Sequence, residues 1–210
     1  MDSFDAAAAH SDRLPREGEP LPPVWALALA LLGLSLVTAA ALAPPTAAAF
    51  RSQPEALAAT LRTGLWLTAA AAPVVALGKG AVLGAIAWAV LVLGGKTPRY
   101  RSALAIVVTG ELILAAQALW IALLIRVRGL AAISSPQDLS IPTGLDLVFP
   151  DPTTPLGALA GSVTPFHAAW VLFLAWRFGR AVGAPVWGVA AALACWLPGA
   201  LVDTLRTLLS

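Results

Sequence analysis

The feature that most constrains this sequence is a pair of long apolar runs joined by a short basic turn. The first run, 74–95, carries one charge at Lys79, and the second run, 102–125, carries one charge at Glu111. Each run is long enough to cross the roughly 30 Å hydrocarbon core of a bilayer as a helix. The turn between the runs breaks the helix with a proline and holds three basic side chains, Lys96, Arg99 and Arg101. The sequence therefore predicts a membrane hairpin with a basic end.

The composition of the whole chain supports a membrane location. Of its 210 residues, 59% are hydrophobic and 11% are charged, whereas soluble domains average about 25% charged residues. Because so few charged residues cannot cover the surface of a globular protein, lipid must cover much of the surface of this one. The net charge of +2 and the position of the basic residues at helix ends argue against nucleic acid as a partner. The excess of arginine and alanine is typical of a GC-rich bacterial genome, which predicts the bacterial inner (plasma) membrane.

The hydropathy pattern predicts an all-α, polytopic membrane helix bundle of about five transmembrane helices in one domain, 24–208. The preceding residues, 1–23, are polar and rich in proline, so we expect a disordered tail. An amphipathic helix at 54–66, with Leu57, Leu61 and Leu65 on one face, is expected to lie in the membrane interface. The expected spans are 24–43, 74–95, 102–125, 163–180 and 181–202.

Two points of this organisation have alternatives. The sequence Ala41-Leu42-Ala43 resembles a signal-peptidase site, but the apolar run before it is long and the tail is acidic, which favours an uncleaved span ended by Pro44 and Pro45. The region after Pro54 is also open to two interpretations. It forms either an interfacial helix followed by a span, or one long kinked helix that extends from Pro54 to Gly95.

The distribution of basic residues predicts the orientation. The longest connection, 129–164, contains no basic residue, whereas the short turns at 96–101 and 177–183 are basic. Because short basic loops remain in the cytoplasm, we expect the two turns and the N-terminus inside and the long connection outside. Thr164 is expected to cap the fourth span, with Pro165 as its first residue.

Charged and polar residues within the spans are the candidate intramembrane site. Counted from Pro98, Lys79 lies 19 residues before the turn and Glu111 lies 13 residues after it. The offset is about 9 Å along the helices, so an ion pair is possible but poorly aligned, and Gln117 is level with Lys79. The functional interpretation is a proton or ion site. The structural interpretation, which we favour, is a buried polar contact that fixes the register of the helices.

The other residues that could carry a function are expected to have packing roles instead. His167 is expected to pack at the outer interface, and it has no second histidine nearby with which to bind a metal. Cys195 reads as a small core residue. Gly80 and Gly84 form a small-xxx-small spacing that favours packing within the chain over dimerisation, so the formation of homo-oligomers is left open. We therefore predict no catalytic residue, no metal and no cofactor.

Two segments of the chain, the basic turn with the start of the following run at 93–108 and the start of the fourth expected span at 164–176, carry a family resemblance. They resemble the Yip family, the Ypt/Rab-interacting integral membrane proteins, in its bacterial branch. The segment LGGKTPRYRSALAIVV is similar to the family's Gly-Gly-basic turn and the helix that follows it. The segment TPFHAAWVLFLAW is similar to the family's Phe-x-x-x-Trp-x-x-x-Leu pattern, here Phe166, Trp170 and Leu174. The resemblance covers roughly residues 50–208 and implies a five-helix fold with a non-enzymatic role. The chain lacks the Asp-Leu-aromatic-Gly-Pro signature of the eukaryotic branch, which argues against a Rab-like partner.

Together these features predict a non-catalytic protein that organises the membrane by binding lipids or other membrane proteins. The alternative, from a different class, is a small transporter or channel component that uses Glu111 and Lys79. The side chains expected to contact lipid or protein partners are Lys96, Arg99, Arg101, Arg177 and Arg180.

Overall fold

The structure, a computed structural model, describes residues 22–51, 53–139, 141, 160 and 163–209. Within these residues every regular element is a helix, which confirms the predicted all-α class. Five α-helices form the body of the described chain, and two short 3-10 helices follow the third of them. The α-helices are α2 (Val24–Ala49), α3 (Glu55–Leu93), α4 (Tyr100–Arg128), α6 (Pro165–Val182) and α7 (Pro185–Leu209).

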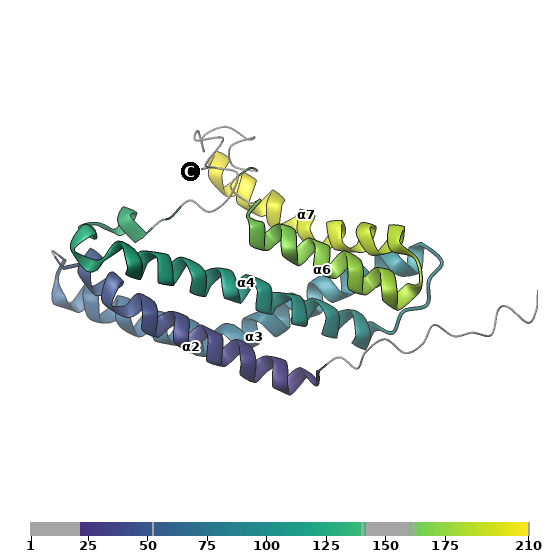
Figure 1. Cartoon of the computed structure of the whole chain (residues 1–210), viewed down its shortest axis with the longest axis horizontal. Coiled ribbons are helices and arrows are strands. Elements are labelled where there is room, and N and C mark those ends of the chain that lie inside the picture. Colours follow the sequence, from purple (N-terminus) through teal and green to yellow (C-terminus); the bar gives the residue numbers. More distant parts are fainter. Residues whose placement is uncertain (1–21, 52, 140, 142–159, 161–162, 210) are drawn as a thin grey trace, which may run out of the picture.

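The helices lie roughly side by side in an elongated bundle. α2, α3 and α4 contact one another, and the α6–α7 hairpin packs on α3 and α4 (Figure 1). The main core lies where the two groups meet and joins apolar side chains of α3, α4, α6 and α7. A smaller core cluster joins Leu27 and Leu31 of α2 to Ala76 of α3 and Val108 of α4.

Four of the described helices, α2, α3, α4 and α7, are long and apolar enough to cross a membrane. This agrees with a membrane-embedded protein and with four of the five predicted spans. The fourth predicted span corresponds to α6, which has 18 residues and is not among the four. Its tryptophans, His167 and two arginines lower its hydropathy, and its buried face packs on the other helices through Trp170, Leu174 and Phe178.

The prediction that Pro44 and Pro45 end the first span is wrong, because α2 continues through both prolines to Ala49. Each proline removes one backbone donor from the helix, so local preference alone favours an end there. Packing maintains the helix instead: Ala48 and Ala49 are buried in a cluster with Ile125 of α4.

α3 is one continuous helix of 39 residues with Pro73 inside it. Of the two arrangements predicted for this region, the structure therefore has the single long helix. The predicted boundary between an interfacial helix at 54–66 and a span beginning at 74 is not present. At 1.5 Å per residue α3 is about 58 Å long, nearly twice the ~30 Å hydrocarbon core. Unless it is strongly tilted, part of α3 therefore extends beyond that core.

The antiparallel α3–α4 pair is held by close backbone contact and by two hydrogen bonds from side chains to backbone carbonyls. A Cβ atom on Gly84 would lie 3.1 Å from Cα of Leu104, so glycine at this position allows an approach that a larger residue would permit only after the helices shift. The predicted small-xxx-small spacing thus serves packing within the chain. The indole of Trp88 donates to the carbonyl of Pro98 at 3.0 Å, and the hydroxyl of Tyr100 donates to the carbonyl of Ala81 at 3.0 Å.

A tight turn at Gly183 joins α6 and α7. Gly183 has φ of 64°, the left-handed conformation that favours glycine at the end of a helix. A Cβ atom on Gly188 would clash with the backbone of Ala175 and Gly179, so the two helices touch at these glycines. The helices occupy Pro165–Val182 and Pro185–Leu209, which moves the predicted boundary between the last two spans from 180 to 183–184.

The segment after α4 folds back on the bundle. It contains the 3-10 helices η1 (Leu130–Ala132) and η2 (Pro136–Leu139), and Ile133 packs in the cluster around Ile125. Residues 142–159 of the predicted long connection lie outside the described residues, as does 1–21 of the predicted tail.

Candidate functional site

The two charges predicted within the membrane hairpin form an ion pair. Nζ of Lys79 on α3 lies 3.0 Å from Oε2 of Glu111 on α4. The offset between the two residues is smaller than predicted from Pro98, because the turn is not centred on that proline: α3 ends at Leu93 and α4 begins at Tyr100. Counted from these helix ends, Lys79 lies 14 residues before and Glu111 lies 11 residues after, an offset of about 4.5 Å. The flexible lysine stem covers that distance.

The two partners of the pair differ in exposure. The Glu111 side chain is 8% exposed, whereas that of Lys79 is 46% exposed. Oε1 of Glu111 has no hydrogen-bond partner among the described residues, so Lys79 is the one described group that neutralises this carboxylate. The Lys79 ammonium also lies 5.9 Å from the ring centroid of Trp170, within the range of a cation–π contact. The ion pair therefore joins α3 to α4, and the contact with Trp170 joins both to α6.

A small cavity opens beside Lys79. Its volume is about 90 Å³, and its lining combines apolar residues with His167 and Cys195. This space suits a few water molecules and is far smaller than the roughly 300–1,000 Å³ of pockets for drug-sized ligands. The Cys195 side chain is buried and its thiol donates to the carbonyl of Leu83 at 3.4 Å, in agreement with the predicted core role.

Gln117 does not join the ion pair, although the sequence placed it level with Lys79. Its Oε1 accepts a hydrogen bond from the hydroxyl of Thr164 at 3.3 Å. Thr164 caps α6 as predicted, since its Oγ1 accepts from the backbone N–H of His167 at 3.1 Å. Nδ1 of His167 lies 2.9 Å from the same hydroxyl. A polar link that the sequence did not reveal therefore connects α4 to the start of α6.

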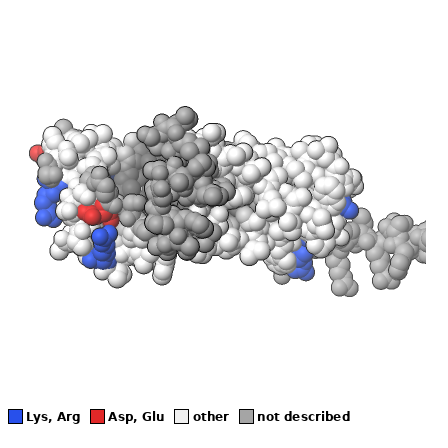
Figure 2. All heavy atoms as spheres, turned by 90° about the horizontal axis from the view of Figure 1, so that it is seen from above, with Lys and Arg blue, Asp and Glu red and all other residues white. Residues whose placement is uncertain are grey.

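The basic residues of two turns gather at one end of the bundle. Trp187, near the start of α7, packs against Gly94 of the α3–α4 turn, which brings the two turns together. The guanidinium groups of Arg177 and Arg180 lie 5.5 and 5.3 Å from the ring of Trp176. Among the described residues on the face seen in Figure 2, basic side chains lie at both ends of the molecule, but acidic side chains lie at only one. We call the end without visible acids the basic end; its residues are Lys96, Arg99, Arg101, Arg177 and Arg180.

The residues that carry the family-like pattern on α6 have a packing role. Trp170 and Leu174 are buried in the main core, and Phe166 is half-buried. The four-residue spacing places these side chains on one face of the helix. The pattern therefore corresponds to the face of α6 that packs on the bundle.

Comparison of the chain with protein-family models, with curated proteins and with solved structures finds no match.

Proposed function

We propose that this protein is a non-catalytic membrane protein that organises the bilayer by binding lipids or other membrane proteins, in the manner of the Yip family. Its place is the bacterial inner membrane, with the N-terminus and the basic end in the cytoplasm. The resemblance of 93–108 and 164–176 to that family points to the same class of function.

The observation that carries this proposal is the distribution of charge. Lys79 and Glu111 neutralise each other at 3.0 Å, so this pair needs no charged ligand to balance it. The described acids Glu55 and Asp138 lie at the opposite end of the bundle from the basic turns, where α3 begins and α4 ends. Near an anionic leaflet each lysine or arginine contributes about 1 kcal/mol of attraction. The basic end therefore suits anionic lipid headgroups or an acidic face of a membrane partner.

The test removes two charges from the basic end. Arg99→Ala combined with Arg101→Ala should lower the affinity for anionic lipid by about 2 kcal/mol, or roughly 25-fold. Lipids that remain bound after purification would be measured by mass spectrometry. The matched control is Arg126→Ala with Arg128→Ala, which removes two charges at the end of α4 and should leave that retention unchanged. Equal retention in all three proteins would refute the proposal.

A second candidate, a small transporter or channel component, is favoured by the cavity beside Lys79. Water in that space would give the ion pair a route for protons. Purified protein in liposomes, under an imposed gradient, distinguishes the two functions. The preferred function predicts no proton or ion flux above that of empty liposomes. A flux that disappears in Glu111→Gln would establish the transporter instead.

A further inference from the structure

A second cavity lies at the end of the molecule opposite the basic end. It has a volume of about 260 Å³ and lies between the last turns of α2 and the first turns of α3. One side of its lining is apolar and includes Phe50, Leu61 and Leu65. The rim carries three charged side chains, Arg51, Glu55 and Arg62, and none of them forms an ion pair within the described residues.

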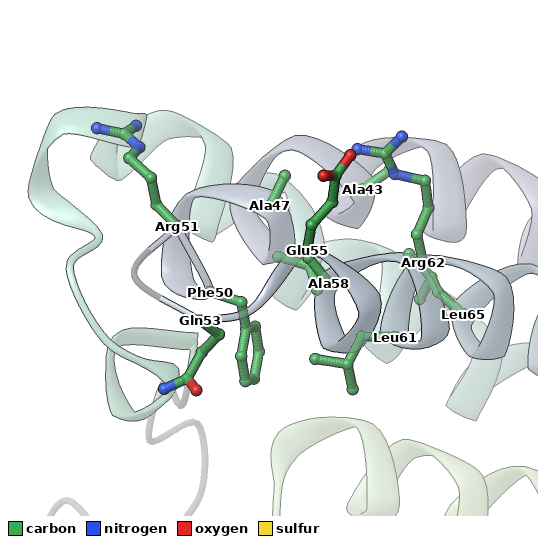
Figure 3. A pocket seen from close by; sticks show the side chains of 11 residues that line it. Ala43, Ala47, Phe50, Arg51, Gln53, Glu55, Ala58, Leu61, Arg62 and Leu65 are labelled. Carbon is green, nitrogen blue, oxygen red and sulfur yellow. The ribbon is translucent and has the colours of Figure 1, made fainter.

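The rim presents both signs of charge close together. Glu55 and Arg62 lie two turns apart on α3, and Figure 3 shows their side chains on the same side of that helix, with Arg51 pointing the same way. Phe50 and Leu61 point to the opposite side. The cavity lining therefore has a carboxylate and two guanidinium groups on one side and an apolar wall on the other.

The length of α3 sets the depth of this cavity in a membrane. Arg62 lies 31 residues before Leu93, which is about 46 Å along the helix. This distance is close to the 40–45 Å thickness of a bilayer that includes its headgroup regions. Glu55 lies seven residues before Arg62, about 10 Å farther along the helix. With the basic end at one surface and α3 tilted, as transmembrane helices commonly are, both side chains come to headgroup level on the other surface. Trp66, 40% exposed and on the same part of α3, agrees with an interfacial position.

We propose that this cavity binds a phospholipid with an ethanolamine headgroup. A guanidinium donates to the phosphate in two parallel hydrogen bonds, which suits Arg62 or Arg51. The primary ammonium donates to a carboxylate, which suits Glu55. A phosphatidylcholine headgroup cannot donate to that carboxylate, and phosphatidylglycerol brings no cation to it. The volume accommodates the headgroup and the first acyl carbons, and the rest of the lipid lies along the apolar wall.

This inference rests on the proposed lipid-binding function and adds the headgroup and the site. The test places the full chain in nanodiscs with equal amounts of phosphatidylethanolamine, phosphatidylglycerol and phosphatidylcholine, and measures the retained lipids by native mass spectrometry. The wild-type protein should retain phosphatidylethanolamine about tenfold more than phosphatidylcholine. Glu55→Gln should abolish that preference over phosphatidylcholine without lowering the retention of phosphatidylglycerol. Ala47→Trp, which fills the cavity from an exposed lining position, should abolish retention there without a change in rim charge.

Two further arms separate this site from the basic end and from soluble ligands. Arg99→Ala with Arg101→Ala should lower retention of phosphatidylglycerol and leave the ethanolamine preference intact. The proposal for the basic end and the proposal for the cavity can therefore be refuted separately. Free phosphoethanolamine in the buffer should not displace the lipid, because it lacks the acyl carbons that contact the apolar wall. Displacement would identify a soluble ligand and overturn the assignment to lipid. Equal retention of the three lipids by the wild type, or an ethanolamine preference that persists in Glu55→Gln, would also overturn it.

Discussion

At the scale of single residues, the buried carboxylate of Glu111 places the strongest demand on its surroundings. A charge buried without a partner destabilises a protein far more than a well-packed apolar replacement. Glu111 is 8% exposed, whereas Lys79 is 46% exposed and can turn its ammonium toward water or headgroups. The two ends of this ion pair are therefore unequal, and loss of the lysine should be the more harmful change.

A double-mutant cycle tests this asymmetry. Lys79→Met leaves the Glu111 carboxylate buried without its partner and should cost about 3 kcal/mol, whereas Glu111→Gln should cost less. The double mutant should be more stable than Lys79→Met alone, because neither charge remains. Thermal unfolding in detergent would measure all four proteins. Strictly additive losses would exclude direct coupling between the two residues.

Asp138 is a second residue with a specific electrostatic environment, outside the spanning helices. Its Oδ2 accepts hydrogen bonds from the backbone N–H and the hydroxyl of both Ser134 and Ser135, at 2.9–3.1 Å. The backbone N–H groups of Ser134 and Ser135, followed by the Ser135 hydroxyl, lower the pKa of Asp138 from 3.8 to about 2. These bonds stabilise the ionised carboxylate and hold the turn after η1.

The lowered pKa predicts a specific dependence on pH. Because the pKa is lower in the folded chain, the contribution of Asp138 to stability is complete above pH 3.8 and is lost as pH falls toward about 2. The wild type should therefore unfold at a higher temperature than Asp138→Asn at pH 6, and the difference should shrink as pH falls through about 2 and vanish below it. A difference that stays constant over this range would contradict the assignment. The side chain is exposed, so the effect should be small.

At the scale of the elements, the sequence predicted the type of each helix better than its ends. Hydropathy identified the apolar runs that form all or part of α2, α3, α4 and α7, because long apolar runs dominate that signal. It failed at the prolines: Pro44 and Pro45 lie inside α2, and Pro73 lies inside α3. Burial of Pro45, Ala48 and Ala49 against neighbouring helices offsets the missing hydrogen bonds. The local sequence pattern around the prolines does not reveal that burial.

The ion pair shows the same limit of sequence reasoning. The types of residue predicted a polar contact between the second and third helices, but Pro98 was a poor reference point for the register. The register depends on the contact between Gly84 and Leu104 and on the hydrogen bond from Tyr100 to Ala81. The mixed-charge rim at Arg51, Glu55 and Arg62 was missed because its residues come from the end of α2 and from α3. The signal that could have revealed it is the cluster of charges flanking Pro54.

The α3–α4 contact gives a prediction for one glycine and its matched control. Gly84→Ala would place a Cβ 3.1 Å from the backbone of Leu104, so the helices must move apart at a cost of about 1–3 kcal/mol. Gly78→Ala, on the same helix, meets nothing within 4 Å and should gain about 1 kcal/mol from helix propensity. Unfolding temperatures in detergent should therefore shift in opposite directions. Stabilisation of both variants would show that α3 and α4 do not approach closely at Gly84.

At the scale of the whole molecule, the two ends differ in charge and in architecture. The basic end contains two short turns, one between α3 and α4 and one between α6 and α7. The opposite end contains the α2–α3 junction, the 3-10 helices after α4, and both Glu55 and Asp138. Short basic loops favour the cytoplasmic side during insertion. This asymmetry predicts one orientation, with the basic end inside and the cavity between α2 and α3 outside.

Cysteine accessibility tests that orientation directly. Cys195→Ala first removes the one native thiol, which is buried, so the background should remain folded. In that background, Ser134→Cys places a thiol in an exposed position at the end with the 3-10 helices, and Thr97→Cys places one in the basic turn. A membrane-impermeant maleimide added to intact cells should label the cysteine at 134 and not the one at 97. Permeabilised cells should allow labelling of both, which controls for burial. Labelling at 97 but not at 134 in intact cells would reverse the orientation and place the basic end away from the cytoplasmic leaflet.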